Sequence, residues 1–166
     1  LAQMLMAHMI GSGEAMGADV HVHKQTVNWI KELLDFPSTA GGVIVNGGSE
    51  ANFTALAAAR NAKAEVDMKV KGVQDVPRKM TCYVSDEGHH CLERSVEIIG
   101  LGNENLRWVK TNDDYSVDMD SLRKAISDDR RAGYHPFCVI GNAGTVNTGA
   151  FDDFNALADL ADRQDL

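Results

Sequence analysis

Short apolar runs alternate with helical segments along most of this chain, and this alternation restricts the possible fold more than any other feature of the sequence. Four runs carry the β-branched and aromatic residues typical of strands; they lie at residues 42–45, 81–84, 106–110 and 137–140. Each is followed by a segment with the apolar spacing of a helix; these segments lie at residues 50–63, 90–99, 118–130 and 153–163. Strands that alternate with helices form a parallel sheet through right-handed crossovers. The sequence therefore predicts an α/β domain in which a mostly parallel sheet is flanked by helices.

Two further helices are predicted ahead of the first strand. Residues 1–16 are apolar and rich in methionine, which indicates packing in a core or against another subunit. Residues 22–34 keep a helical spacing until Pro37 ends the segment. We therefore expect leading helices over residues 1–37 and an α/β core over residues 38–166.

The charge balance and the cysteine content narrow the class of protein. Lys and Arg number 16 against 24 Asp and Glu, and the net charge of -8 argues against nucleic acid or an anionic membrane as a partner. No apolar run approaches the roughly 20 residues that a membrane span requires. The three cysteines have no C-x-x-C spacing and indicate a reduced compartment, so we expect a cytoplasmic protein without a metal site. Cys82 and Cys138 lie inside apolar runs and are predicted to be core thiols, whereas Cys91 stays undecided.

One predicted strand leads into a glycine-rich turn at the start of a helix. Residues 43–52 read Val-Ile-Val-Asn-Gly-Gly-Ser-Glu-Ala-Asn, so Gly47, Gly48 and Ser49 stand between an apolar run and helix-forming residues. Unpaired N–H groups and the positive end of the helix dipole meet at such a point, glycines let the backbone approach an anion, and the serine adds a hydroxyl donor. The turn predicts a phosphate-binding cup, although neither a P-loop nor a dinucleotide fingerprint is present. A turn that only joins a strand to a helix stays open as the alternative.

The loops at one edge of the predicted sheet differ from those at the other. Ligands of parallel sheets bind at the carboxyl ends of the strands. The loops expected there are polar and mostly contain glycine; they are residues 46–49, 85–90, 111–114 and 141–149. Residues 66–79, which are charged and irregular, are predicted to form a surface loop. Function is therefore expected at one edge. The last helix ends at Leu166 without a following strand, so we expect a part of a larger domain.

Three blocks of the sequence resemble one enzyme family in the same order. Residues 41–52 resemble the phosphate-binding segment of the group II pyridoxal-phosphate-dependent amino-acid decarboxylases, which include the aromatic-amino-acid, glutamate and tyrosine decarboxylases. The second block is Ser-Asp-Glu-Gly-His at residues 85–89, and the third is Ala-Gly-Thr-Val-Asn-Thr-Gly-Ala-Phe-Asp at residues 143–152. Residues 29–37 also resemble the helix that precedes the first block in the family. The resemblance covers nearly the whole chain.

This resemblance implies a fold, a cofactor and a set of roles. The fold is that of the aspartate-aminotransferase-like, fold type I enzymes, of which this chain would be an incomplete large domain, and the cofactor is pyridoxal 5'-phosphate. Gly47, Gly48 and Ser49 would hold the cofactor's phosphate. His89 matches the histidine that stacks on the pyridine ring, from where an imidazole can approach the substrate carboxylate. Without the resemblance, His89 is more typical of a loop histidine bonded to a backbone carbonyl.

The third block leaves one contact open. Thr145 stands where the family has a threonine close to the cofactor, but many members carry a second threonine where this chain has Val146. The polar contact to the cofactor is therefore predicted for Thr145 and Asn147, with Thr148 still open. Asn and Thr also suit a tight turn that contacts no ligand.

The resemblance places two essential residues after Leu166: the aspartate that pairs with the pyridine nitrogen and the Schiff-base lysine. Decarboxylation requires both, so this segment alone is expected to be catalytically inactive. Lys110 closes a predicted strand at the functional edge and is the one alternative imine donor that we consider. A solvated lysine at a strand end is the plainer interpretation of Lys110.

The reaction implied by the resemblance is the loss of the α-carboxylate of an L-amino acid, which gives an amine and carbon dioxide, in a homodimeric protein. Aromatic substrates are favoured over acidic ones. The first alternative is an aminotransferase or a carbon–carbon lyase of the same fold, although many aminotransferases place an aromatic residue where His89 stands. The second alternative is a non-catalytic module that binds a nucleotide or a sugar phosphate.

Overall fold

The computed structural model describes residues 18–166, so the helix predicted over residues 1–16 lies outside the described residues. The chain divides into two compact units, Leu1–Asn46 and Gly47–Leu166, and each is described by itself. In the part of the chain that the structure describes, no helix is both long and apolar enough to cross a membrane.

The described part of the first unit consists of the helix α2 (Ala18–Leu33) and an extended segment after it. The helix that was predicted to end before Pro37 is confirmed. The strand predicted over residues 42–45 is wrong, because none of the described residues pairs with that segment. Its Val43 and Ile44 are 59% and 50% exposed. Their β-branched side chains favour an extended backbone, but a strand also requires a hydrogen-bonded neighbour.

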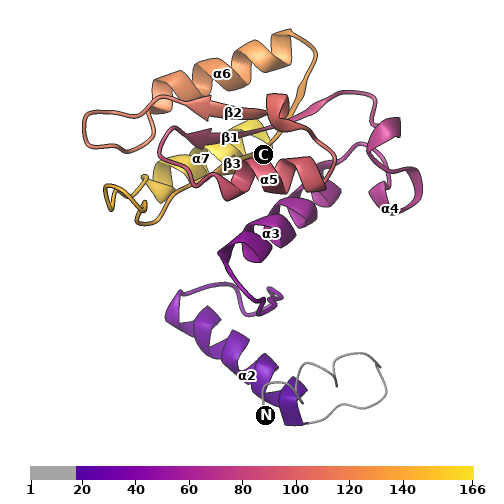
Figure 1. Cartoon of the computed structure of the whole chain (residues 1–166), viewed down its shortest axis with the longest axis vertical. Helices are drawn as coiled ribbons and strands as arrows, with labels where there is room; N and C mark the ends of the chain where they lie inside the picture. The colour runs from indigo at the N-terminus through magenta and orange to yellow at the C-terminus, as the bar shows by residue number, and fades with distance from the viewer. Residues whose placement is uncertain (1–17) are drawn as a thin grey trace. The chain divides into compact units, whose positions relative to one another are not determined.

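The second unit contains the predicted alternation of strands and helices (Figure 1). Its elements are α3 (Gly48–Lys63), α4 (Met68–Lys71), η1 (Val73–Asp75), β1 (Met80–Ser85), α5 (Cys91–Ile98), η2 (Asn103–Asn105), β2 (Leu106–Val109), α6 (Met119–Arg131), β3 (His135–Ile140) and α7 (Phe154–Gln164). The three strands are parallel and their order is β2-β1-β3. The fold class is therefore confirmed. The region predicted as a surface loop also holds the short helices α4 and η1.

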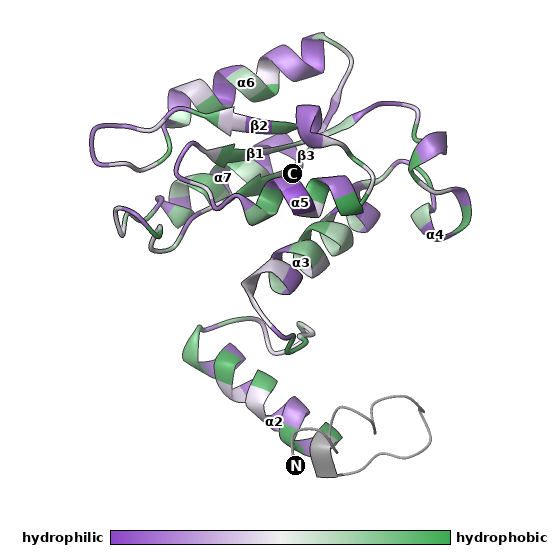
Figure 2. Ribbon diagram, in the orientation of Figure 1, coloured by the Kyte–Doolittle hydropathy of each residue, from purple (hydrophilic) through white to green (hydrophobic). Residues whose placement is uncertain are grey.

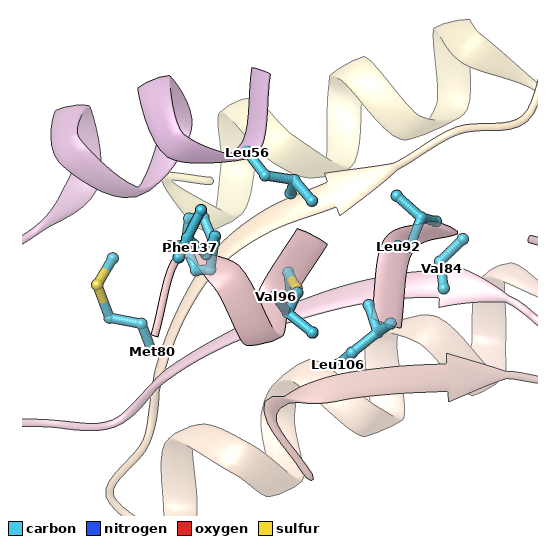
Figure 3. Close-up of a cluster of buried hydrophobic side chains, with 9 residues drawn as sticks. Leu56, Met80, Val84, Leu92, Val96, Leu106 and Phe137 are labelled. Carbon is cyan, nitrogen blue, oxygen red and sulfur yellow. The ribbon is translucent and has the colours of Figure 1, made fainter. Parts of the chain in front are cut away.

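The sheet has a helical layer on each face. Helices α3 and α5 cover one face, where they enclose a cluster of buried side chains from both helices and all three strands (Figure 3). Helices α6 and α7 cover the other face, where Tyr83 and Val109 of the sheet pack against leucines and an isoleucine of these helices. Figure 2 shows the hydrophobic colouring that runs along β1 between the two layers. All six residues of β1 are buried, as expected for a central parallel strand.

A buried ion pair ties α6 to the sheet. Asp129 is 8% exposed, and it accepts hydrogen bonds from Tyr83 Oη at 2.7 Å and from Arg107 Nη2 at 2.9 Å. Burial disfavours the ionised carboxylate, but the hydrogen bonds from Arg107 and Tyr83 outweigh it, so the pKa of Asp129 lies below its ordinary value. Asp118, the first residue of the helix predicted over residues 118–130, caps the start of α6 by accepting from the N–H groups of Asp120 and Ser121.

The cysteines follow the sequence prediction. Cys82 is fully buried, and Cys138 packs against the same cluster under α3 and α5. Cys91 is partly buried at the first position of α5. It lies at the carboxyl edge of the sheet, where the sequence predicts the functional site.

Candidate functional site

A hollow of about 320 Å³ lies at the carboxyl ends of β1 and β3. Its walls are the loop of residues 86–90, which follows β1, and residues 142–147, which follow β3. The hollow brings together three of the predicted site residues, His89, Thr145 and Asn147, from loops more than fifty residues apart in the sequence. A second hollow, of about 360 Å³, opens at the amino ends of the strands and holds none of the predicted site residues. The hollow that holds predicted site residues therefore lies at the carboxyl edge of the sheet, where the sequence predicts the site.

The loop after β1 is shaped by a close-packed glycine. The N–H of Gly88 donates to Ser85 O at 2.8 Å and turns the chain. A Cβ on Gly88 would lie 2.5 Å from a methyl carbon of Val84 and 3.1 Å from both Ser85 O and the Trp108 ring, so no larger residue fits without a shift of the strand. The tight turn delivers His89, which is exposed, to the wall of the hollow.

The imidazole of His89 is held by one hydrogen bond. Its Nδ1 accepts from the N–H of Cys91 at 3.1 Å. The plainer interpretation of His89, a bond to a backbone carbonyl, is therefore not the contact that forms. A nitrogen that accepts carries no proton, so the neutral ring has its proton on Nε2. His89 thus keeps one N–H donor for a molecule in the hollow. The neighbouring His90 is exposed and lies 3.9 Å from Glu93.

The opposite wall is an arch formed by residues 142–152. Thr145 Oγ1 lies 2.6 Å from Thr148 Oγ1, and both hydroxyls accept from the N–H of Ala150, at 3.2 and 3.4 Å. Thr148 does not line the hollow, whereas Thr145 and Asn147 do. Among the described residues, the side chain of Asn147 has no hydrogen-bond partner, so its amide is available to a ligand. Of the three residues left open by the sequence, Asn147 is the one that lines the hollow with a side chain not hydrogen-bonded to the described residues.

The base of the arch is fixed by a buried carboxylate. Asp152 is 6% exposed, and its two oxygens accept from the N–H groups of Val117 and Asn142, each at 2.7 Å. The amide of Asn142 also donates to Ser85 Oγ at 2.9 Å. Sequence reasoning gave neither Asn142 nor Asp152 a role. An aspartate ahead of a helix is typical of an N-cap, and Asp152 stands directly before Asp153, which does cap α7.

The glycine-rich turn forms the start of α3. Gly47 is the N-cap with an extended backbone, and no side chain of residues 18–166 caps the helix. A Cβ on Gly47 or on Gly48 would meet none of the residues that the structure describes within 4 Å, so these residues leave open space at the first turn. Among the described residues, the N–H groups of Gly48 and Ser49 have no acceptor. Open donors at a helix start match an anion such as a phosphate.

One side-chain contact joins this turn to the His89 loop. Asn52, the fifth residue of α3, donates from Nδ2 to Cys91 Sγ at 3.2 Å. Helices α3 and α5 run side by side, so their starts lie at the same edge of the sheet (Figure 1). Gly47, Gly48 and Ser49 do not line the 320 Å³ hollow itself. The structure therefore places them beside the hollow rather than in its wall.

Lys110 stands apart from the hollow. It lines a different surface depression beside Ser121 and Lys124 of α6. Its position agrees with a solvated lysine at a strand end.

The donor set of this edge suits one kind of molecule. Open N–H groups at the start of α3 suit an anionic tail, while the His89 ring and the Asn147 amide suit a planar polar head. The conserved domain of the pyridoxal-dependent decarboxylases matches residues 5–166. The chain belongs to the pyridoxal-dependent decarboxylase family. Pyridoxal phosphate is the cofactor of that family, and the residues at this edge fit it.

Curated relatives and solved structures agree with this assignment. The chain is 39% identical over 141 residues to an aromatic-L-amino-acid decarboxylase of Bacillus atrophaeus, covering 85% of this chain and 28% of the relative. It is 32% identical to a glutamate decarboxylase-like protein of Gibberella zeae, covering 94% of this chain and 29% of the relative. The chain therefore spans less than a third of these relatives.

The family fold is also that of solved decarboxylases. Mouse CSAD in its apo form superposes with a TM-score of 0.84 at 28% identity, over 89% of this chain and 30% of that one. Catharanthus roseus tryptophan decarboxylase, solved with L-tryptophan, superposes with a TM-score of 0.81 at 26% identity, over 98% and 36% of the two chains. The predicted resemblance and the fold type I architecture of this decarboxylase family are thus confirmed.

Proposed function

We propose that the protein containing this chain decarboxylates an L-amino acid to an amine and carbon dioxide, with pyridoxal phosphate as cofactor. One observation carries the proposal: His89 and the arch residues Thr145 and Asn147 face one hollow at the carboxyl edge of the sheet. Family membership supports it, because the curated relatives above are named as decarboxylases. The bound cofactor supplies an electron sink for the charge left at the α-carbon when the carboxylate departs.

The start of α3 holds the phosphate in this proposal. Gly48 and Ser49 present N–H groups without an acceptor among the described residues, and the helix dipole adds about half a positive charge at that point. The Ser49 hydroxyl adds a further donor. Gly47 and Gly48 keep the space before these groups open.

His89 would help to hold the cofactor from one wall of the hollow, and its Nε2–H would be available to donate to the substrate carboxylate. The hydrogen bond from Cys91 to Nδ1 fixes the ring and the position of its proton. Asn147 and Thr145 supply polar contacts from the opposite wall. A fixed donor near the carboxylate orients the bond that breaks.

The finer properties of the protein are part of the same proposal. An aromatic amino acid is the favoured substrate, supported by the 39% identity to an aromatic-L-amino-acid decarboxylase. Acidic substrates are the alternative, since an acidic amino acid decarboxylase of Bos taurus is 31% identical over 139 residues. We also propose that the full-length protein is a cytoplasmic homodimer; the three free cysteines support a reduced compartment.

The test uses the full-length protein. It should purify yellow with bound pyridoxal phosphate and release carbon dioxide and an amine from at least one aromatic or acidic L-amino acid. Keto-acid formation without carbon dioxide would indicate an aminotransferase instead. A colourless protein that binds a nucleotide or a sugar phosphate would contradict the cofactor assignment itself.

Two variants of His89 separate its functions. In His89→Asn, the new side-chain oxygen can still accept from the Cys91 N–H, whereas His89→Ala removes both that acceptor and the ring. Both variants should lose most of the turnover, and His89→Asn should keep the cofactor better than His89→Ala. Full activity in His89→Asn would exclude a catalytic role for the imidazole.

A further inference from the structure

We propose that Asp152 is a positioning residue of this site: it holds the arch so that Thr145 and Asn147 face the His89 loop across the hollow. The inference rests on the proposed function in one respect, that the hollow receives the cofactor. It assigns a role to a carboxylate that contacts neither the hollow nor a ligand.

The two ends of the arch are closed by a reciprocal pair. Asp152 Oδ2 accepts from the N–H of Asn142 at 2.7 Å, and the N–H of Asp152 donates back to Asn142 O at 2.9 Å. The side-chain amide of Asn142 adds a third bond to Oδ2 at 3.3 Å. Three bonds between two residues fix the distance and the angle at which the arch leaves β3.

The same carboxylate links the arch to the connection that follows β2 and, through Asn142, to the end of β1. Its other oxygen accepts from the N–H of Val117, on the connection that leads from β2 to α6. The side-chain amide of Asn142 in turn donates to Ser85 Oγ, at the end of β1. Ser85 is followed directly by the loop that carries His89. Asp152 is therefore linked through one side chain to the strand that bears the opposite wall.

The remaining bonds of the arch are internal. The N–H groups of Gly144 and Thr145 donate to Ala150 O at 3.0 and 3.1 Å, and the N–H of Gly149 donates to Thr145 O at 2.9 Å. These bonds set the shape of the arch but not its direction relative to the sheet. Among the described residues, the direction of the arch is set at its base, where Asp152 accepts hydrogen bonds from Val117 and Asn142.

A carboxylate suits this position because N–H donors converge on both of its oxygens. Bonds to an ionised acceptor are shorter and stronger than neutral ones. Asparagine would keep one oxygen and turn an NH₂ group toward either the Val117 or the Asn142 N–H, which leaves two donors facing each other. Asp152→Asn is therefore a nearly isosteric change that removes one of the hydrogen bonds at the base of the arch.

The neighbouring residue offers a matched control. Asp153 is exposed and caps α7 by accepting from the N–H of Ala156 at 3.0 Å. Asparagine is about as good an N-cap as aspartate, so Asp153→Asn removes the same charge one residue away without breaking a contact. Both variants are made in the full-length protein.

Two readouts are compared in wild type and both variants. Hydrogen–deuterium exchange of the peptide over residues 142–152 reports the order of the arch without cofactor, and titration of the apo protein with pyridoxal phosphate reports affinity. In Asp152→Asn we expect faster exchange of that peptide and an affinity loss of about tenfold or more, the size of losing one charge-assisted hydrogen bond. Asp153→Asn should match wild type in both.

The outcomes separate this inference from the proposed function. If wild type binds the cofactor and Asp152→Asn binds it as tightly as Asp153→Asn does, the positioning role is overturned while the function stands. If wild type does not bind it, the proposed function fails, and the exchange measurement alone decides whether Asp152 holds the arch.

A milder variant covers the case in which Asp152→Asn does not fold. Asn142→Ala removes the side-chain bonds to Ser85 and Asp152 and keeps the backbone pair. It should change both readouts in the same direction by a smaller factor. Unchanged exchange and affinity in Asn142→Ala would then overturn the inference.

Discussion

The side-chain amide of Asn52 lies 3.2 Å from the sulfur of Cys91 and joins two helix starts that are 39 residues apart in the sequence. Cys91 makes two contacts: its sulfur accepts from Asn52, and its own N–H donates to the ring of His89. The turn proposed to hold the phosphate and the imidazole proposed to face the substrate are thus connected through one residue. A substitution of Cys91 can therefore alter the positions of both the glycine-rich turn and the His89 ring.

The contact predicts different results for two small substitutions of Cys91. Serine keeps an acceptor for the Asn52 amide, whereas alanine removes it. Cys91→Ser should bind pyridoxal phosphate about as wild type does, and Cys91→Ala should bind it several-fold more weakly, the effect of roughly 1 kcal/mol for one hydrogen bond. The measurement is a cofactor titration of the full-length apo protein.

A double-mutant cycle provides the control for that comparison. Asn52→Ala should weaken binding as Cys91→Ala does, and the double variant should be no weaker than either single one, because both remove the same bond. Fully additive losses would show that the two residues act independently.

The open space before α3 predicts an unusual outcome for Gly48→Ala. The new methyl group meets no atom of the described residues within 4 Å, and alanine favours a helix, so stability should stay equal or rise by about 0.5–1 kcal/mol. Affinity for pyridoxal phosphate should nevertheless fall, because the methyl group enters the space proposed for the phosphate. Gly41→Ala is the control, since its methyl group also meets none of the described residues within 4 Å and Gly41 is not among the residues proposed to hold the phosphate. Unchanged affinity in Gly48→Ala would place the phosphate elsewhere.

The three cysteines should differ in reactivity. Burial raises the pKa of the Cys138 thiol to about 11 and raises that of Cys82 further, so neither forms a thiolate near neutral pH. Cys91 is partly buried at the edge of the site. Iodoacetamide at pH 8 should therefore modify Cys91 first, as read by peptide mass spectrometry, and bound pyridoxal phosphate should slow that reaction. Preferential labelling of Cys138 would contradict the packing described for β3.

Acid should weaken the contact between α6 and the sheet. The pKa of Asp129 is held below its ordinary value, so the stabilisation from its bonds is complete above about pH 4, the usual value for an unfolded aspartate, and is lost as the pH falls through the lower folded value. Asp129→Asn should lower the free energy of unfolding by about 2 kcal/mol at neutral pH and flatten its decrease in acid.

The control for Asp129 lies on the same helix. Asp128 is more exposed and pairs with Lys124 at 2.6 Å, so Asp128→Asn should cost less than about 1 kcal/mol. Urea unfolding of the full-length protein between pH 3 and pH 7 measures both variants. Equal losses in the two would show that the bonds of Asp129 add nothing beyond a surface ion pair.

The strands and helices of the second unit follow closely from the sequence. The strand predicted over residues 81–84 is β1 with one more residue at each end, and the helix predicted over residues 118–130 is α6, shifted by one residue. Periodicity is a local property, so it identifies these elements without knowledge of their neighbours. The strand predicted over residues 42–45 is wrong for the same reason, because pairing depends on a second segment that local patterns do not reveal.

The site was predictable only in part. The carboxyl ends of parallel strands share one edge, and this rule alone brings His89 together with Thr145 and Asn147. The contacts that hold these residues in place were not predictable. Asn52 and Cys91 carry no signal that they meet, and Asp152 looks like a helix cap until the arch is seen to close on it.

The closed base of the arch has a consequence for protein engineering. Since residues 143–151 bond among themselves and are anchored by the pair of Asn142 and Asp152, the segment resembles a cassette between two fixed ends. Exchanging that cassette for one of another length or polarity would remodel one wall of the hollow while the sheet beneath keeps its register.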